Sequence, residues 1–70
     1  MFHPQTAYKH NNTLDTAIIP IVILEDNFKF VKMVAMWYNI HYDQAIGHEE
    51  ITIQKSDFHN WKEWKKDGTT

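Results

Sequence analysis

The chain has 70 residues, no cysteine and a formal net charge of −2 at pH 7. This length allows one domain, which buries only about 60% of its unfolded surface, and the lack of cysteine excludes disulfides and thiolate ligands for zinc. All seven basic residues are lysine. Arginine supplies the bidentate fork that phosphates favour, and acidic residues outnumber basic ones, so the composition argues against a dedicated nucleic-acid-binding protein.

The N-terminal segment, residues 1–16, is polar and has no hydrophobic period. Such a segment lacks the apolar surface that would order it, so we expect an N-terminal arm that lies apart from the core. Phe2, Tyr8 and Leu14 are the side chains able to pin this arm onto the rest of the chain. Residues 17–70 are then expected to form a single small β domain.

Two apolar runs, residues 17–24 and 28–40, are separated by the polar residues 25–27. β-branched runs flanking Asp and Asn, which tolerate tight reversals, predict an antiparallel hairpin. Pro20 cannot donate to a β-ladder, so the first strand is expected at the margin of the sheet or at a bulge. Residues 31–37 are apolar on both faces of their strand, which indicates that both faces need cover.

The second reversal is expected between residues 39 and 47, with Gly47 as the natural site for a positive φ. A third strand is predicted over residues 48–54. In this strand Ile51 and Ile53 alternate with polar residues, a pattern typical of a sheet with one solvated face.

Three aromatic residues, Phe58, Trp61 and Trp64, recur every three positions near the C-terminus. This spacing predicts a short helix over residues 57–66 with one aromatic stripe, or alternatively a 3₁₀-like turn, and the stripe is the candidate cover for the second face of the sheet. The predicted fold is therefore mainly β. We expect a three-stranded antiparallel meander, SH3-like or another small barrel, with a short C-terminal helix packed on it.

Candidate sites for chemistry are weak. His41, Asp43, His48 and Glu49 bracket one loop, but their spacing matches no established metal motif. Glu49 and Glu50 are adjacent on a predicted strand, so they point to opposite faces and cannot share a pocket. We therefore expect no catalytic residue, no bound metal and no cofactor, and hence no enzymatic activity.

Aromatic residues carry the remaining signal, with four Phe, three Trp and three Tyr in 70 residues. A core this small cannot bury every ring, and exposed rings are typical of protein interfaces. Trp64 is expected at the rim of the aromatic stripe, where it would anchor a partner. The partner-binding residues expected from the sequence are Trp64, Lys65, Trp37, Tyr42, Glu25 and Asp26.

The function expected from these features is non-enzymatic binding of another protein. The residue usage is that of an A/T-rich gene, which favours a phage or mobile-element product that inhibits or redirects a host factor. Two alternatives stay open: single-stranded nucleic-acid binding through aromatic and lysine residues, and a phage structural or decoration subunit. A homo-oligomer through the edge strand is also compatible with the pattern.

The predicted location is the cytoplasm. The first residues lack the basic region and apolar core of a signal peptide, and no apolar run approaches the length of a membrane span. We therefore expect no membrane partner.

Overall fold

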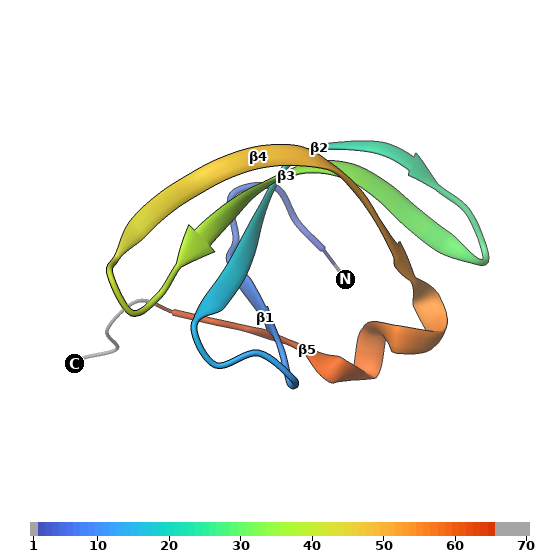
Figure 1. Cartoon of the computed structure of the whole chain (residues 1–70). Helices are drawn as coiled ribbons and strands as arrows, with labels where there is room; N and C mark the ends of the chain where they lie inside the picture. The colour runs from blue at the N-terminus through green and yellow to red at the C-terminus, as the bar shows by residue number, and fades with distance from the viewer. Residues whose placement is uncertain (1, 66–70) are drawn as a thin grey trace.

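The computed structural model describes residues 2–65, which form one open five-stranded antiparallel sheet and a short 3₁₀ helix (Figure 1). The elements are β1 (Tyr8–His10), β2 (Thr16–Asp26), β3 (Phe30–Asn39), β4 (Gln44–Gln54), η1 (Lys55–Asn60) and β5 (Trp61–Glu63). The strand order is β4-β3-β2-β1-β5. Strands β2, β3 and β4 arch over β1 and β5, and η1 connects the end of β4 to β5 (Figure 1).

The β2–β3 hairpin confirms the central prediction from the sequence. Its turn is held by Asn27, whose side-chain oxygen accepts the backbone N–H groups of Lys29 at 2.8 Å and Phe30 at 3.0 Å. An Asn side chain that takes over backbone hydrogen bonds in this way stabilises a tight reversal. The turn thereby fixes the register that runs from Asp26 opposite Val31 to Thr16 opposite Asn39.

The position of β2 corrects one prediction. β2 lies between β3 and β1, so the expectation that residues 17–24 lie at the margin of the sheet is wrong. The alternative for Pro20 is confirmed, because the register shifts between Pro20 and Val22, as it does at a β-bulge. β1 pairs with β2 only at Ile18, and beyond it the Pro20 carbonyl accepts the backbone N–H of Gln5 at 2.9 Å. Pro20 is therefore tolerated where the regular ladder has already ended.

The second reversal also differs from the prediction. The positive φ is at Asp43, with φ 57°, and the described glycine Gly47 has none. Asp tolerates this left-handed conformation better than most residues, so the turn can close four positions earlier than expected. β4 consequently starts at Gln44, and Gly47 lies inside it opposite Trp37.

The C-terminal segment is not the helix expected over residues 57–66. Six residues form the 3₁₀ helix η1, and the chain then extends into β5, which pairs with β1 from His10 opposite Trp61 to Tyr8 opposite Glu63. The alternative left open by the sequence, a 3₁₀-like turn, is observed, but only Phe58 of the three aromatic residues lies in it, so their spacing of three does not reflect its period. The sheet therefore has five strands rather than three: β1 to β4 form a meander, and β5 returns to pair with β1 at the other edge. Lys66, the last residue of the predicted helix, lies outside the described residues.

The core lies on the inner face of the arch and includes part of the N-terminal segment. Of the three side chains expected to pin the N-terminal segment, Phe2 and Tyr8 are both 6% exposed and pack with the buried side chains of the sheet, whereas Leu14 is 92% exposed. The large apolar area of these two rings stabilises the packing of the N-terminal segment, although the residues around them are polar. The buried residues that complete this cluster are Ile18, Val31, Met33, Ala35 and Ile53.

Candidate functional site

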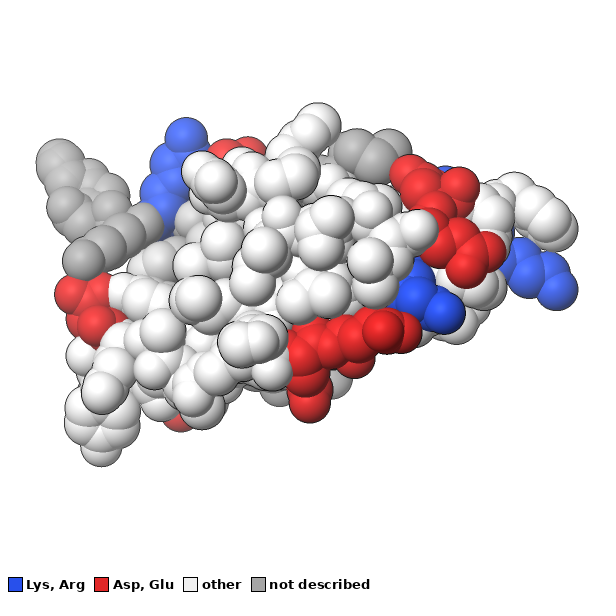
Figure 2. Space-filling model, turned by 90° about the horizontal axis from the view of Figure 1, so that it is seen from above, with Lys and Arg blue, Asp and Glu red and all other residues white. Residues whose placement is uncertain are grey.

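The side of the sheet that faces away from the core carries an apolar surface, which we call the outer face. Its residues follow from the strand register. Ile19 lies opposite Met36 and Val22 opposite Val34, and Tyr38 is the next residue of β3 on the same face. Viewed from above, this side shows a broad surface free of charged side chains (Figure 2). The helix η1 packs on the core side through Phe58, so among residues 2–65 no helix covers the outer face.

The bulges of β2 enlarge the apolar surface toward one margin. Ile21 and Leu24 are the residues left out of the register at the two shifts, and they are 46% and 50% exposed, with Val22 at 45%. An extra residue in a strand rotates side chains out of the regular alternation. Three neighbouring aliphatic residues of one strand, Ile21, Val22 and Leu24, are therefore exposed together, unlike the isolated aliphatic side chains of an ordinary surface.

At the opposite end, the outer face is bounded by a pair of rings. Trp64 lies against Tyr38 with ring centroids 5.8 Å apart and an angle of 43° between the planes. The Trp64 backbone N–H donates to the carbonyl of Ala7 at 2.9 Å, which continues the pairing of β5 with the N-terminal segment. A shallow hollow of about 460 Å³ lies beside these rings, with Ile19 and Lys65 also in its wall.

Charged residues lie across the end of the outer face that is remote from Trp64. Glu25 on β2 is opposite Lys32 on β3, and the Lys32 Nζ lies 3.8 Å from a carboxylate oxygen of Glu50 on β4. Acidic side chains are visible beside the white surface in Figure 2. One lysine lies between two glutamates, so this margin has a net negative charge. The 3.8 Å ion pair between Lys32 and Glu50 is long and exposed, and it contributes little stability.

The residues expected to bind a partner do not form one site. Trp64 and Lys65 lie beside the outer face, whereas Trp37 points to the inner face, where its indole N–H donates to Glu49 at 3.1 Å. Trp37 also lines an apolar hollow of about 230 Å³ together with Trp61. Tyr42 lies in the β3–β4 turn, 73% exposed, with its ring edge against His41.

The acidic pair at the end of β2 is divided between two roles. Glu25 accepts a hydrogen bond from the Asn27 side chain at 3.0 Å and faces Lys32. Asp26 forms an ion pair with Lys55 at 2.7 Å, which ties the hairpin to the start of η1. Glu25 is therefore the member of the pair at the margin of the outer face, and Asp26 holds the fold.

The sequence does not reveal which of the two apolar faces of β3 stays open. Val22 lies within residues 17–24, and Val34 and Met36 lie within residues 33–38, stretches in which every residue is apolar, so the sequence does not distinguish the exposed side chains from the buried ones. The apolar residues on both faces of β3 are the sequence feature that points to this surface. The sequence predicts that a helix covers the second face, but η1 packs on the inner side, where Phe58 contacts the core.

A histidine and a carboxylate are also brought together across the fold. His10 Nε2 donates to Asp57 at 3.0 Å, while His10 Nδ1 accepts the backbone N–H of Asn12 at 3.1 Å. The Trp61 ring stands edge-on to the imidazole at 5.0 Å. Because both ring nitrogens are engaged within the protein, the pair serves to fasten η1 and β5 to β1 rather than to transfer protons.

The pKa of the Asp57 carboxyl lies below its ordinary value of 3.8. The main cause is a hydrogen bond from the Asn60 side chain; burial opposes it, and His10 and Trp61 add to the lowering. A depressed pKa means that the ionised group stabilises the folded state above the unfolded pKa, and that this contribution is lost as the pH falls through the folded pKa.

We therefore expect Asp57→Asn to melt at a lower temperature than the wild type above about pH 4, with the difference vanishing toward pH 2. Thermal melts between pH 2 and 7 measure this. Asp15→Asn is the matched control, because Asp15 lies in an exposed loop and bonds its neighbour Thr16. A gap between Asp57→Asn and wild type that stays constant down to pH 2 would contradict the assignment.

The residues considered for a metal site are dispersed. His48 lies opposite Met36 on the outer side of β4, whereas Glu49 is opposite Ala35 on the inner side, and His41 and Asp43 occupy the preceding turn. Within the described chain, no group of three His, Asp or Glu side chains is placed to hold a metal ion.

Across residues 2–65, none of the helical structure has the length and apolar character needed to cross a membrane. No protein-family model matches the chain, and neither a curated protein nor a solved structure shows significant similarity to it.

Proposed function

We propose that this protein is a non-enzymatic module that binds another protein through the outer face. The observation that carries the proposal is the continuous exposed apolar surface of β2 and β3, from the half-exposed Val22 to the Tyr38–Trp64 ring pair. Exposed apolar area of this kind is weakly favoured in a free protein and is typical of interaction surfaces. An aromatic pair beside aliphatic side chains is the composition of interface anchors.

The charges at the margin favour a particular kind of partner surface. Glu25 and Glu50 flank Lys32 at one end, and the whole chain has a net charge of −2. A partner with an apolar centre and basic residues at its rim would match this arrangement. The same observation makes nucleic acid the weaker candidate, because Lys32, Lys55 and Lys65 lie beside carboxylates rather than forming a basic groove.

We propose further that the fold is a partly open SH3-like barrel. The support is the strand order β4-β3-β2-β1-β5, with a short 3₁₀ helix between the fourth and fifth strands. In this proposal the protein is a phage or mobile-element product that acts in the cytoplasm on a host factor. The small size and the A/T-rich residue usage support that origin.

A capture experiment with matched variants tests the binding proposal. Immobilised wild-type protein is incubated with bacterial lysate, and the bound proteins are identified by mass spectrometry. We expect a partner that binds the wild type and the control Leu14→Ser, whose side chain is 92% exposed in the β1–β2 loop, but is lost with Val22→Ser. Both variants replace an exposed aliphatic side chain with serine, and the control replaces the larger and more exposed of the two, at a site away from the outer face. Equal capture by both variants would exclude the outer face as the binding surface.

A further inference from the structure

β4 forms one margin of the sheet, and within the described chain it pairs with β3 alone (Figure 1). Its register with β3 is unbroken from Gly47 opposite Trp37 to Gln54 opposite Phe30. The register shift lies before Gly47, where Ile46 has no partner on β3. Residues 47–54 are therefore a regular strand whose second edge is unpaired, and such an edge is a template for another strand.

One hydrogen bond at the end of β4 determines which backbone groups lie on the unpaired side. The Lys55 N–H donates to the Lys29 carbonyl at 2.8 Å. These two residues lie opposite each other, one step beyond the last pair of the β3–β4 register. In an antiparallel ladder, residues that exchange hydrogen bonds with a neighbouring strand alternate with residues whose N–H and C=O point away from it. Every second residue back from Lys55 therefore bonds with β3. The residues between them, which point their backbone groups to the unpaired side, are His48, Glu50, Thr52 and Gln54.

The side chains of β4 differ between the two faces of the sheet. On the outer side, Glu50 and Thr52 are exposed. On the inner side, Ile51 is half-buried and Ile53 is buried. Glu49 also lies on the inner side, so the adjacent glutamates place one carboxylate on each face. A strand placed beside β4 would therefore meet two isoleucines on one face and a carboxylate on each.

Neither carboxylate is strongly paired within the protein. Glu49 accepts a hydrogen bond from the neutral indole N–H of Trp37 at 3.1 Å, and the ion pair of Glu50 with Lys32 is 3.8 Å long. Two copies of this edge paired together would gather four carboxylates along one seam, which disfavours a second copy as the occupant. A basic strand is complementary, because two adjacent lysines also point to opposite faces.

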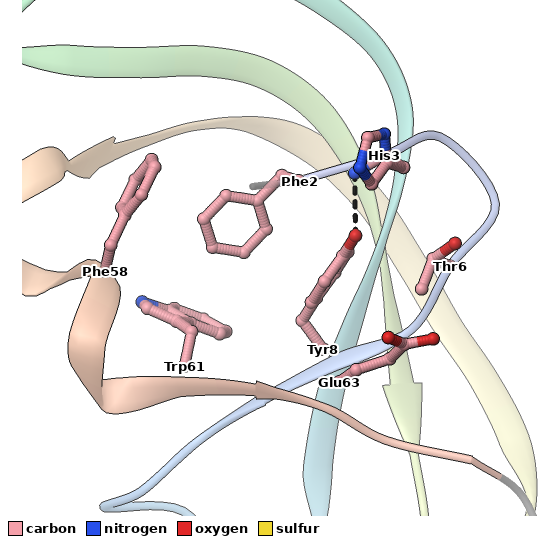
Figure 3. Close-up of a pocket in the computed structure, with 7 residues that line it drawn as sticks. All are labelled: Phe2, His3, Thr6, Tyr8, Phe58, Trp61 and Glu63. Atoms are coloured by element: carbon pink, nitrogen blue, oxygen red, sulfur yellow. Dashed lines mark hydrogen bonds between the residues drawn. The ribbon is translucent and has the colours of Figure 1, made fainter.

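The opposite margin of the sheet offers no comparable edge. β5 is three residues long and begins with Trp61, whose ring lies 5.6 Å from that of Phe2, measured between centroids. Figure 3 shows the Phe2 ring among those of Tyr8, Phe58 and Trp61, so this end of the sheet is used to close the core. A short edge strand is one of the ways in which proteins limit pairing with other chains.

We propose that the unpaired edge of β4 binds an extended segment of another protein that carries two adjacent basic residues. The segment adds to the sheet as an antiparallel strand, and its backbone bonds to the N–H and C=O groups of Glu50 and Thr52. Its basic residues lie opposite Glu49 and Glu50, and its apolar residues lie beside Ile51 and Ile53. This inference goes beyond the outer-face proposal, because its contacts are on β4 rather than on β2 and β3.

Peptide titrations with ¹⁵N-labelled protein test the proposal. The probe is the capped peptide Thr-Val-Thr-Val-Lys-Lys-Thr, which places valines beside the isoleucines and lysines opposite the glutamates. We expect it to bind saturably and at least about tenfold more tightly than the control Thr-Val-Thr-Val-Glu-Glu-Thr. Equal affinities of the two peptides, or no binding of the lysine peptide, would overturn the proposal.

Amide hydrogen exchange tests the geometry of the edge in the same samples. In the protein alone, the amides of Glu50 and Thr52 should exchange rapidly, whereas those of Glu49 and Ile51 should be protected by their bonds to β3. The lysine peptide should slow exchange at Glu50 and Thr52 about tenfold or more. Unchanged exchange at both residues in the presence of the bound peptide would contradict strand addition.

Two variants of Thr52 separate backbone pairing from side-chain effects. Proline removes the N–H that faces the peptide, whereas valine retains it. We expect Thr52→Pro to weaken binding of the lysine peptide about tenfold or more, and Thr52→Val to bind as the wild type does. Because this N–H points away from β3, both variants should fold, which circular dichroism verifies. Equal binding by folded Thr52→Pro and the wild type would refute backbone pairing, and the exchange experiment decides the question if Thr52→Pro does not fold.

Two glutamate variants test the role of charge. Glu50→Gln should weaken binding of the lysine peptide about threefold or more, whereas Glu63→Gln on β5, where the side chain is similarly exposed, should leave it unchanged. Equal effects of the two variants would exclude a specific role of Glu50. Val22→Ser should not affect peptide binding, so this test is independent of the outer-face proposal.

Sedimentation of the wild type tests the second copy as the occupant. We expect a monomer, because self-pairing brings the carboxylates of the two copies together. A dimer that Thr52→Pro abolishes would assign the edge to a second copy of the chain and overturn the proposal.

Discussion

Trp61→Ala is expected to unfold the protein at 25 °C. The Trp61 ring contacts Phe2 and His10 edge-on and packs against the core, and the residue itself begins β5 by pairing with His10. Truncating a core tryptophan to alanine removes about 3–5 kcal/mol from the free energy of unfolding. A domain of this size has a total stability of only about 5 kcal/mol, so little would remain.

Circular dichroism melts and chemical denaturation measure this effect. Trp61→Phe is the control, because a phenyl ring keeps part of the contact with Phe2 while removing the indole. We expect Trp61→Phe to melt cooperatively at a lower temperature, and Trp61→Ala to show no cooperative transition. A cooperative melt of Trp61→Ala within a few degrees of wild type would show that Trp61 is not part of the core.

Trp64→Ala is expected to fold and yet to lose most of its affinity for the partner identified by capture. Trp64 packs against one ring, Tyr38, and its hydrogen bond to Ala7 uses the backbone, which alanine retains. Removal of an aromatic anchor weakens protein binding by about 2 kcal/mol or more. The dissociation constant should therefore rise about 30-fold.

Binding titrations and melts of the same preparations separate affinity from stability. Tyr42→Ala is the matched control, because Tyr42 is a more exposed aromatic residue in the β3–β4 turn, away from the outer face. We expect its affinity to equal that of the wild type. Unchanged binding by Trp64→Ala would remove the ring pair from the interface.

The long hairpin strands were predictable from the sequence because they are specified locally. β2 and β3 are β-branched runs, and Asn27 between them marks the turn that holds them together. The predicted ranges 17–24 and 28–40 differ from the observed strands by two residues or fewer at each end. The alternation of Ile51 and Ile53 likewise revealed the inner face of β4.

The two short strands were not predictable, since three residues are too few to show a period. β1 and β5 form because Tyr8, Lys9 and His10 find partners more than 50 positions away in the chain. A spacing of three between aromatic residues then suggested a helix, although Trp61 belongs to a strand and faces the core. Pro20 likewise predicted an edge strand, although β2 lies inside the sheet. Only the tertiary structure shows that β1 pairs with β2 at Ile18 alone, which leaves Pro20 outside the paired region.

The candidate site was predicted in part. Trp64 lies beside the outer face and Trp61 packs against the core, as the sequence suggested. Trp37, Tyr42 and Glu25 lie on three different parts of the molecule, because rings and charges grouped along the sequence are separated by the turns between the strands. The contact between the rings of Phe2 and Trp61 has no local signal either, because it joins the N-terminal segment to β5, which pairs with β1.

The pairing of β1 with β5 also determines when the protein can fold during synthesis. Tyr8 leaves the ribosome early, but its strand partner Glu63 is made 55 residues later. At a synthesis rate of about 5–20 residues per second, roughly 3–10 seconds pass between the synthesis of Tyr8 and that of Glu63. The β2–β3 hairpin can form during this time, whereas closure of the core follows only after β5 has emerged. During this interval the apolar side chains that β5 will cover are exposed, which is the condition under which a nascent chain is most prone to aggregate.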